Sequence, residues 1–148
     1  MLKIQPPTAI DFDPAIVAKD RDNKPVLMID VRFSSMYGSP ELDIFKMEEY
    51  QHIPFLMFAN SNVIRIFKSP DFAEVNRLET KKVLGFYDGS SIEGIIYQFT
   101  LITLLQSWLR DLDYHWKSEN PPYLEEIKAI GLLALLEDIT TEDLQLLS

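Results

Sequence analysis

Short apolar runs, separated by polar turns, dominate the first half of the chain. They lie at residues 15–18, 25–31, 53–59 and 63–68. The second and third runs are almost unbroken, which is typical of strands covered on both faces. The last run alternates apolar and polar residues, as in a strand with one face in water. The pattern therefore predicts a sheet built mainly from these four segments.

The connections between these runs carry turn and helix signals. Asp22 and Asn23 lie in an all-polar segment and tolerate the positive φ angles of a hairpin turn, although the usual glycine is missing. Ser39 and Pro40 supply the N-cap and the first-position proline of a helix, which we expect to cover about 40–51. The order expected is a strand hairpin, a helix and a second strand hairpin.

The second half of the chain has mostly helical periodicity. We expect a long helix over 91–114, another beginning at Pro121 and a last short helix over 140–147. Residues 71–90 are ambiguous, with a fifth strand at 83–87 as one interpretation. The helix over 91–114 carries two apolar stripes and needs two partners. The first stripe consists of Ile92, Ile95, Ile96, Phe99, Ile102, Leu105, Leu109 and Leu112, and the second consists of Tyr97, Leu101, Leu104 and Trp108. One partner is the sheet, and the other is either the C-terminal helices or a second copy of the chain.

The length of 148 residues suits one domain, 1–148, with one hydrophobic core. We expect an α/β fold in which a mixed central sheet of four or five strands is flanked by helices. The core of this fold lies in residues 11–68, and a helical C-terminal part covers 90–148. No internal repeat or linker divides the sequence.

The amino-acid composition excludes some kinds of function and disfavours others. Cysteine is absent, which excludes disulfides, thiolate metal sites and cysteine nucleophiles and fits a reducing compartment. The net charge of −9 disfavours a dedicated nucleic-acid binder, because phosphate contacts need clustered positive charge, but a nuclease with an acidic metal site is not excluded. The start lacks a signal-peptide pattern, and the apolar stretch at 95–109 is too short to span a bilayer. We therefore expect a cytoplasmic protein without membrane association.

Asp30 and Arg32 are charged residues at the end of an otherwise apolar run, and a buried carboxylate is costly without a partner, a metal or a role in catalysis. The surrounding sequence at 12–32, FDPAIVAKDRDNKPVLMIDVR, resembles the hairpin of the PD-(D/E)XK nuclease superfamily, most nearly the N-terminal nuclease domain of type I restriction enzymes. The sequence at 51–68, QHIPFLMFANSNVIRIFK, resembles the hairpin that follows the helix in that family. The resemblance covers 11–68 and implies a restriction-endonuclease-like fold.

The resemblance also implies metal-assisted hydrolysis of phosphodiesters, in which two carboxylates hold Mg²⁺ and a lysine helps to activate water. The family pattern has Pro-Asp on one strand and acid-x-Lys on the next. Here the residue after the proline is Ala15, and the second motif is Asp30-Val31-Arg32. Asp13, two residues before Ala15 and on the same strand face, offers a replacement ligand. Arg32 can supply positive charge, but it stays protonated and cannot act as a base.

Two functions from different classes follow. In the first, the chain is a catalytically degenerate family member that acts as a binding or assembly module, needs no cofactor and forms a homodimer through the helix over 91–114. In the second, it is a Mg²⁺-dependent DNA endonuclease in which Asp13 and Asp30 are metal ligands and Arg32 assists catalysis. A purely structural alternative for the residues is an ion pair between Asp30 and Arg32, spaced i and i+2 on one strand face. A small-molecule site beside Asp30 has no motif in its favour.

Other kinds of site have weaker support. His52 and His115 are far apart in sequence and make a poor zinc site without cysteines. The serine and glycine residues form neither a nucleophile elbow nor a phosphate loop. Four aromatic residues of the C-terminal half are expected in the core or in an interface rather than in a base-stacking platform, given the acidic chain. These are Tyr97, Trp108, Tyr114 and Trp116.

Overall fold

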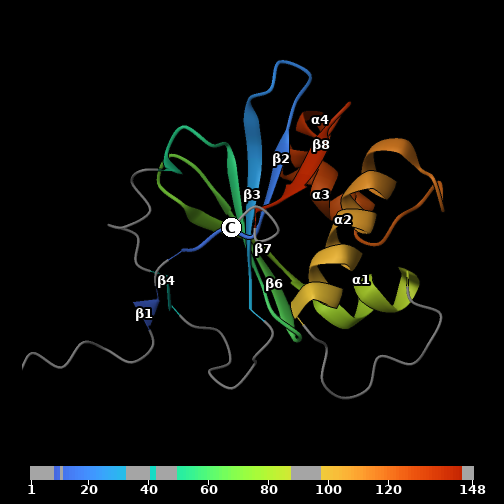
Figure 1. Ribbon diagram of the computed structural model, residues 1–148, viewed down its shortest axis with the longest axis horizontal. Coiled ribbons are helices and arrows are strands. Elements are labelled where there is room, and N and C mark those ends of the chain that lie inside the picture. Colours follow the sequence, from blue (N-terminus) through green and yellow to red (C-terminus); the bar gives the residue numbers. More distant parts are fainter. Residues whose placement is uncertain (1–8, 11, 33–40, 43–49, 88–97, 145–148) are drawn as a thin grey trace, which may run out of the picture.

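The computed structural model describes residues 9–10, 12–32, 41–42, 50–87 and 98–144 (Figure 1). Within these residues, the largest unit is a six-stranded mixed sheet with the order β7-β6-β5-β3-β2-β8. Its strands are β2 (Ile16–Lys19), β3 (Pro25–Val31), β5 (Phe55–Ala59), β6 (Val63–Lys68), β7 (Ala73–Glu79) and β8 (Thr140–Asp143). The α/β class expected from the sequence is confirmed.

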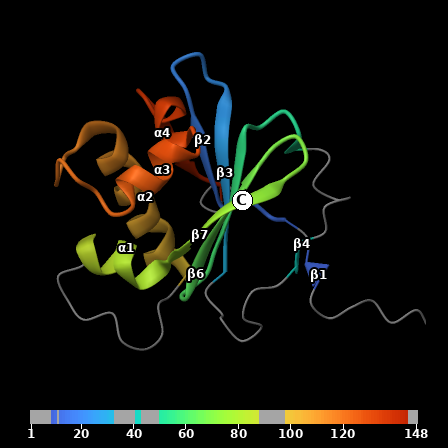
Figure 2. The ribbon, with the colours of Figure 1, turned by 180° about the vertical axis from the view of Figure 1, so that it is seen from behind.

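Helices cover one face of this sheet, and Figures 1 and 2 show them all on the same side. In the described residues they are α1 (Thr80–Tyr87), α2 (Gln98–Tyr114), α3 (Leu124–Ala129) and α4 (Leu132–Leu135). A small parallel pair, β1 (Ala9–Ile10) and β4 (Glu41–Leu42), lies on the opposite side of the sheet. No helix within the described ranges has the length and apolar character needed to cross a membrane.

Two local hairpins account for most of the sheet. β2 and β3 are antiparallel around a tight turn in which Asn23 has a φ of 64°, so the predicted hairpin is confirmed. The carboxylate of Asp20 holds this turn by accepting hydrogen bonds from the N–H groups of Asp22 and Lys24, at 2.9 and 3.0 Å. β5, β6 and β7 are antiparallel neighbours, and β3 lies parallel to β5, which joins the two hairpins in one sheet.

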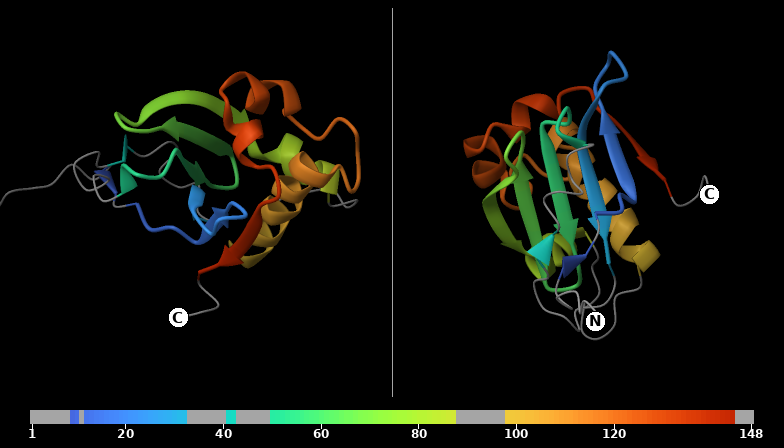
Figure 3. Two further views of the ribbon diagram at one scale, coloured as in Figure 1. Left: turned by 90° about the horizontal axis from the view of Figure 1, so that it is seen from above. Right: turned by 90° about the vertical axis from the view of Figure 1, so that its left-hand side faces the viewer.

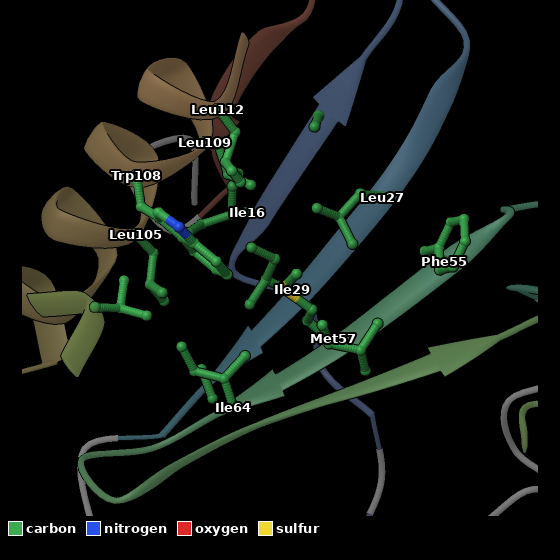
Figure 4. Close-up of a cluster of buried hydrophobic side chains, with 14 of the residues drawn as sticks. Ile16, Leu27, Ile29, Phe55, Met57, Ile64, Leu105, Trp108, Leu109 and Leu112 are labelled. Carbon is green, nitrogen blue, oxygen red and sulfur yellow. The ribbon is translucent and has the colours of Figure 1, made fainter. Parts of the chain in front are cut away.

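The main core lies between the sheet and α2. Figure 4 shows side chains of α2 directed toward the sheet, with Trp108 at their centre facing Ile29. The Trp108 side chain is fully buried, and its indole N–H donates a hydrogen bond of 2.9 Å to the backbone oxygen of Pro122. The single polar atom of this large ring is therefore paired inside the core, as burial of tryptophan requires.

Both apolar stripes of α2 are covered by the same chain over 98–114. Leu101 and Trp108 of the second stripe are fully buried, and Leu104 is half-buried against the core. α1 packs directly on α2, and Pro122, in the segment before α3, contacts Trp108. The second partner of the helix is thus supplied by neighbouring helical segments, and the described part of α2 does not require a second copy of the chain. Tyr97 lies outside the described residues.

The prediction of a fifth strand at 83–87 is wrong, because these residues belong to α1. The segment does contain a strand, β7, but it ends before α1 begins. Val83, Leu84 and Tyr87 have the spacing of one helix face, and the first two are fully buried. The hydroxyl of Thr80 donates a hydrogen bond of 2.8 Å to the backbone oxygen of Asn60, which fixes the junction between strand and helix.

The prediction of a helix over 140–147 is also wrong at its start, since Thr140–Asp143 forms β8 and pairs antiparallel with β2. Two consecutive β-branched threonines favour an extended backbone. The free edge of β2 also needs partners for its backbone N–H and C=O groups. Pairing with a distant strand outweighed the local helix-capping pattern. Residues 145–147 lie outside the described residues.

The prediction of a helix over 40–51 also fails at its start. Glu41–Leu42 is β4, which pairs with β1, so the prediction is wrong at these two residues. The pairing partner, Ala9–Ile10, is distant in sequence, and nothing local to residue 40 indicates it. Residues 43–49 of the expected helix lie outside the described residues.

The second face of the sheet carries its own smaller apolar cluster. Phe58 and Leu56 of β5 pack there with Phe67 of β6 and with Phe12 and Phe72 from flanking segments. The β1–β4 pair lies on this side, as the views in Figure 3 show. Along β3, Leu27, Ile29 and Val31 lie in the core under the helices, whereas Met28 packs on the second face, and this alternation places Asp30 on the side of Met28. Asp30 therefore points away from the helical layer.

Candidate functional site

Asp30 stands near the carboxyl end of β3, between β2 on one side and β5 on the other. In the ladder with β5 it lies directly opposite Phe58. Its side chain is only 1% exposed. The strand pattern therefore places one carboxylate inside a sheet face that is otherwise lined by aromatic and aliphatic groups.

Three hydrogen bonds compensate the burial of this carboxylate. Arg32 donates from Nε to Oδ1 at 2.7 Å and from Nη2 to Oδ2 at 3.1 Å, which is a bidentate arrangement. The backbone N–H of Asp13 donates to Oδ2 at 2.8 Å. The ion pair between Asp30 and Arg32, considered as the structural alternative, is confirmed.

Burial raises the pKa of the Asp30 carboxyl above its ordinary value. The hydrogen bonds from Arg32 and from the Asp13 N–H lower the pKa, but they do not cancel the cost of removing the charge from water. The guanidinium of Arg32 is itself 40% exposed, so water weakens its attraction for the carboxylate. The charged form of Asp30 is therefore less favourable in the folded protein than that of an aspartate in water.

Asp13 reaches this site through its backbone and not through its carboxylate. Its N–H is bonded to Asp30, while its side chain is exposed and makes no hydrogen bond or ion pair with any residue that the structure describes. The negative charge of Asp13 adds to the upward shift of the Asp30 pKa. The structure thus brings Asp13, Asp30 and Arg32 together, but with Arg32 and not a second carboxylate against Asp30.

Ala15 lies just before β2, and its side chain belongs to the core under the helices and not to the sheet face that carries Asp30. Ile16 pairs with Ile29, and the N–H of Ala15 donates a 2.8 Å hydrogen bond to the backbone oxygen of Ile29. Ile29 is therefore the neighbour of both Ile16 and Ala15, and the pairing of β2 with β3 does not continue to Ala15 and Asp30. Ala15 is fully buried. The sequence position at which the family resemblance implies a second metal ligand is thus an alanine buried in the main core.

This set of donors does not fit a Mg²⁺ centre. Mg²⁺ sites use carboxylates and water in octahedral geometry, and here both oxygens of Asp30 accept hydrogen bonds that a metal ion must displace. A divalent ion at Oδ1 would also lie against the positive guanidinium of Arg32. Within the described residues, no group of three histidine, aspartate or glutamate side chains is arranged to hold a metal.

A charged row continues from Asp30 across the same face. Phe58 pairs in register with Arg65 of β6, and Arg65 with Arg77 of β7. Glu74 joins the two arginines, at 2.6 Å from Arg65 Nε to Oε2 and 2.9 Å from Arg77 Nε to Oε1. The row therefore places an acid–arginine pair on each side of the central phenylalanine.

Sequence reasoning did not single out Arg65, Arg77 or Glu74. Arg65 stands at the polar position of the alternating run at 63–68, and this was the only local signal. Glu74 and Arg77 fall in the segment 71–90 that was left ambiguous, so no strand register was available to bring them together.

Comparison with known proteins returns no significant match to any protein-family model, curated protein or solved structure. The site is therefore interpreted from its own geometry. The resemblance of residues 11–68 to PD-(D/E)XK nucleases remains a sequence-based expectation.

Proposed function

We propose that this chain is a catalytically degenerate PD-(D/E)XK protein with a restriction-endonuclease-like fold, and that it acts as a binding module. The observation that supports this most is the engagement of Asp30. Both of its oxygens accept hydrogen bonds from Arg32 and from the Asp13 backbone, and the sequence position of the expected second ligand is Ala15, which is buried in the main core. A hydrolytic site of this family needs a second carboxylate and a base, and this arrangement supplies neither.

This proposal does not include homodimerisation through the helix over 91–114. The two apolar stripes of the helix need a second partner besides the sheet, for which the C-terminal helices and a second copy of the chain were the alternatives. Over the described residues 98–114 both stripes are covered by the same chain. The binding function is therefore assigned to a single copy and to surfaces other than the stripes of α2.

A Mg²⁺-dependent endonuclease using Asp13 and Asp30 is the second candidate. The observation in its favour is proximity, since the Asp13 N–H contacts Asp30 and the Asp13 carboxylate is exposed. This activity requires Arg32 to release Asp30, so that the two carboxylates can share a metal ion.

Incubation of the purified protein with supercoiled plasmid and Mg²⁺ or Mn²⁺ separates the two candidates. The degenerate protein leaves the plasmid supercoiled, with no difference between wild type and Asp30→Asn. Nicking by the wild type that Asp30→Asn abolishes would overturn the proposal in favour of the endonuclease. Arg77→Gln is the matched control, because it removes an arginine of the same sheet face without touching Asp30.

A further inference from the structure

A pocket of about 550 Å³ opens on the helical side of the molecule, between the C-terminal half of α2 and the start of β8. α2 contributes Ser107, Arg110 and Tyr114, which lie at i, i+3 and i+7 on one helix face. The segment after α2 contributes Trp116, and the entry to β8 contributes Thr140. Asp30 points to the other face of the sheet, so this pocket is separate from the candidate site described above.

Trp116 is held in place although it is exposed. The residue is 54% exposed, yet its indole N–H donates a 3.0 Å hydrogen bond to the backbone oxygen of Ser107. Asp111 fixes the segment that follows α2. Its fully buried carboxylate accepts hydrogen bonds from the backbone N–H groups of Lys117 and Ser118, at 2.9 and 3.2 Å. The ring is therefore positioned before any ligand arrives, which lowers the entropic cost of binding.

The C-terminal aromatic residues were expected in the core or in an interface, and of these Trp108 lies in the core whereas Tyr114 and Trp116 do not. Tyr114 is 58% exposed and shares the pocket with Trp116. Large exposed aromatic rings that line one pocket are unusual on a soluble surface and mark binding sites. They offer flat apolar faces on which a planar ring can stack.

Arg110 gives the pocket its charge. Its side chain is exposed and forms neither a hydrogen bond nor an ion pair with any residue in the described ranges. A guanidinium with free donors matches phosphate and carboxylate oxygens in bidentate geometry. The hydroxyl of Thr140, on an exposed residue, adds a neutral donor and acceptor at the opposite wall. The pocket thus pairs ring-stacking surfaces with one cation.

We infer that this pocket binds a nucleoside monophosphate, with the base stacked on Trp116 and Tyr114 and the phosphate on Arg110. The volume lies within the range of small-ligand sites. The net charge of −9 repels long polyanions, whereas one phosphate group needs only one favourable cation. The same chemistry is present in a free nucleotide and in the terminal nucleotide of a single strand, and the test distinguishes these sources.

Tryptophan fluorescence provides the assay, since Trp108 is fully buried and Trp116 is exposed. Adenosine monophosphate is expected to quench the Trp116 signal with saturation, and Trp116→Phe identifies the quenched ring. Adenosine and ribose 5-phosphate each lack one half of the ligand and are expected to bind at least about tenfold more weakly. Calorimetric titration of the same ligands gives the dissociation constants independently.

Variants test each half of the pocket. Arg110→Gln is expected to weaken adenosine monophosphate about tenfold or more while leaving adenosine unchanged, because only the phosphate contact is lost. Trp116→Ala is expected to weaken both by about five- to a hundredfold, because stacking is lost. Lys81→Gln, which removes an exposed charge from α1, is the control for net charge and leaves binding unchanged. Circular dichroism verifies that each variant is folded.

The outcomes are distinct. Binding of the free nucleotide but not of a short single-stranded oligoadenylate identifies a nucleotide site, and binding of both with the same dependence on Arg110 and Trp116 identifies a site for strand ends. Absence of saturable binding by either probe, or equal affinity for adenosine and adenosine monophosphate, overturns the proposal. None of these results depends on whether the plasmid assay detects cleavage, so the two proposals fail independently.

Discussion

The carboxylate of Asp30 loses its water on folding and gains two nitrogen atoms of Arg32 and one backbone N–H in exchange. A buried ion pair of this kind contributes little net stability, but removal of one partner leaves an uncompensated charge. Arg32 is thus the residue on which the tolerance of Asp30 depends. This gives the site a structural role that can be measured without any knowledge of a ligand.

Arg32→Gln is expected to lower the free energy of unfolding by about 1–3 kcal/mol. The effect is smaller than for a fully buried pair, because the Arg32 side chain is 40% exposed. Urea unfolding of the wild type, Arg32→Gln, Asp30→Asn and the double variant measures the coupling between the two residues. The double variant is expected to be more stable than Arg32→Gln alone, and purely additive losses would contradict the interpretation.

Two carboxyl groups make stability depend on pH. Burial raises the pKa of both Asp30 and Asp113 in the folded protein, so the folded state holds these protons more tightly than the unfolded state. The corresponding stabilisation is complete below the ordinary aspartate pKa of about 4 and is lost as the pH rises through the raised pKa. The free energy of unfolding should therefore be higher at about pH 5 than at about pH 8.

The other acidic groups of the chain also lower the free energy of unfolding as the pH rises. The test is therefore the difference in pH dependence between each variant and the wild type. Asp30→Asn or Asp113→Asn should flatten the pH dependence, since each removes one group that binds a proton on folding. Asp22→Asn, in the exposed β2–β3 turn, should leave it nearly unchanged. An unchanged slope in both core variants would show that neither carboxyl is responsible.

At the scale of elements, α2 connects the sheet to the helical layer. Trp108 fills the centre of this contact and has no exposed surface. Trp108→Ala is expected to destabilise the fold by about 3–5 kcal/mol through the cavity it leaves, and Trp108→Phe by clearly less. Chemical unfolding monitored by circular dichroism measures both, with Trp116→Phe as the matched control for loss of an exposed indole. Equal losses for Trp108→Ala and Trp116→Phe would mean that α2 is not packed as described.

The elements that the sequence predicted correctly share a local origin. β2, β3, β5 and β6 are continuous apolar or alternating runs closed by their own turns, so nothing distant decides their structure. β4 and β8 instead depend on partners far along the chain, β1 and β2, which no local pattern contains. Of the candidate site, the sequence indicated the Asp30–Arg32 pair because i, i+2 spacing fixes a shared strand face. It did not indicate Glu74, whose contacts depend on a register set by three strands.

At the scale of the whole molecule, the distribution of apolar surface bears on assembly. α2 was expected to present a free stripe to a second copy, but its described residues are covered by α1, by the segment before α3 and by the sheet. The helix itself was predicted correctly from its periodicity. The segments that pack on it depend on the chain topology, which periodicity does not specify. The exposed large apolar side chains of the described residues lie instead at the end of α2, just after it and near the end of α1, at Tyr114, Trp116 and Phe86.

The protein is accordingly expected to sediment as a monomer at micromolar concentration, because a stable dimer needs an extended complementary surface and the stripes of α2 are already used. Sedimentation velocity at several concentrations checks this. If a dimer appears, Leu104→Glu decides whether α2 forms it, since Leu104 is half-buried and is the most accessible of the described members of the second stripe. Dissociation by Leu104→Glu, with circular dichroism unchanged, would restore the helix-mediated dimer. A dimer that survives this substitution would locate the contact on another surface, and Trp116→Ala would then test whether the exposed aromatic residues form it.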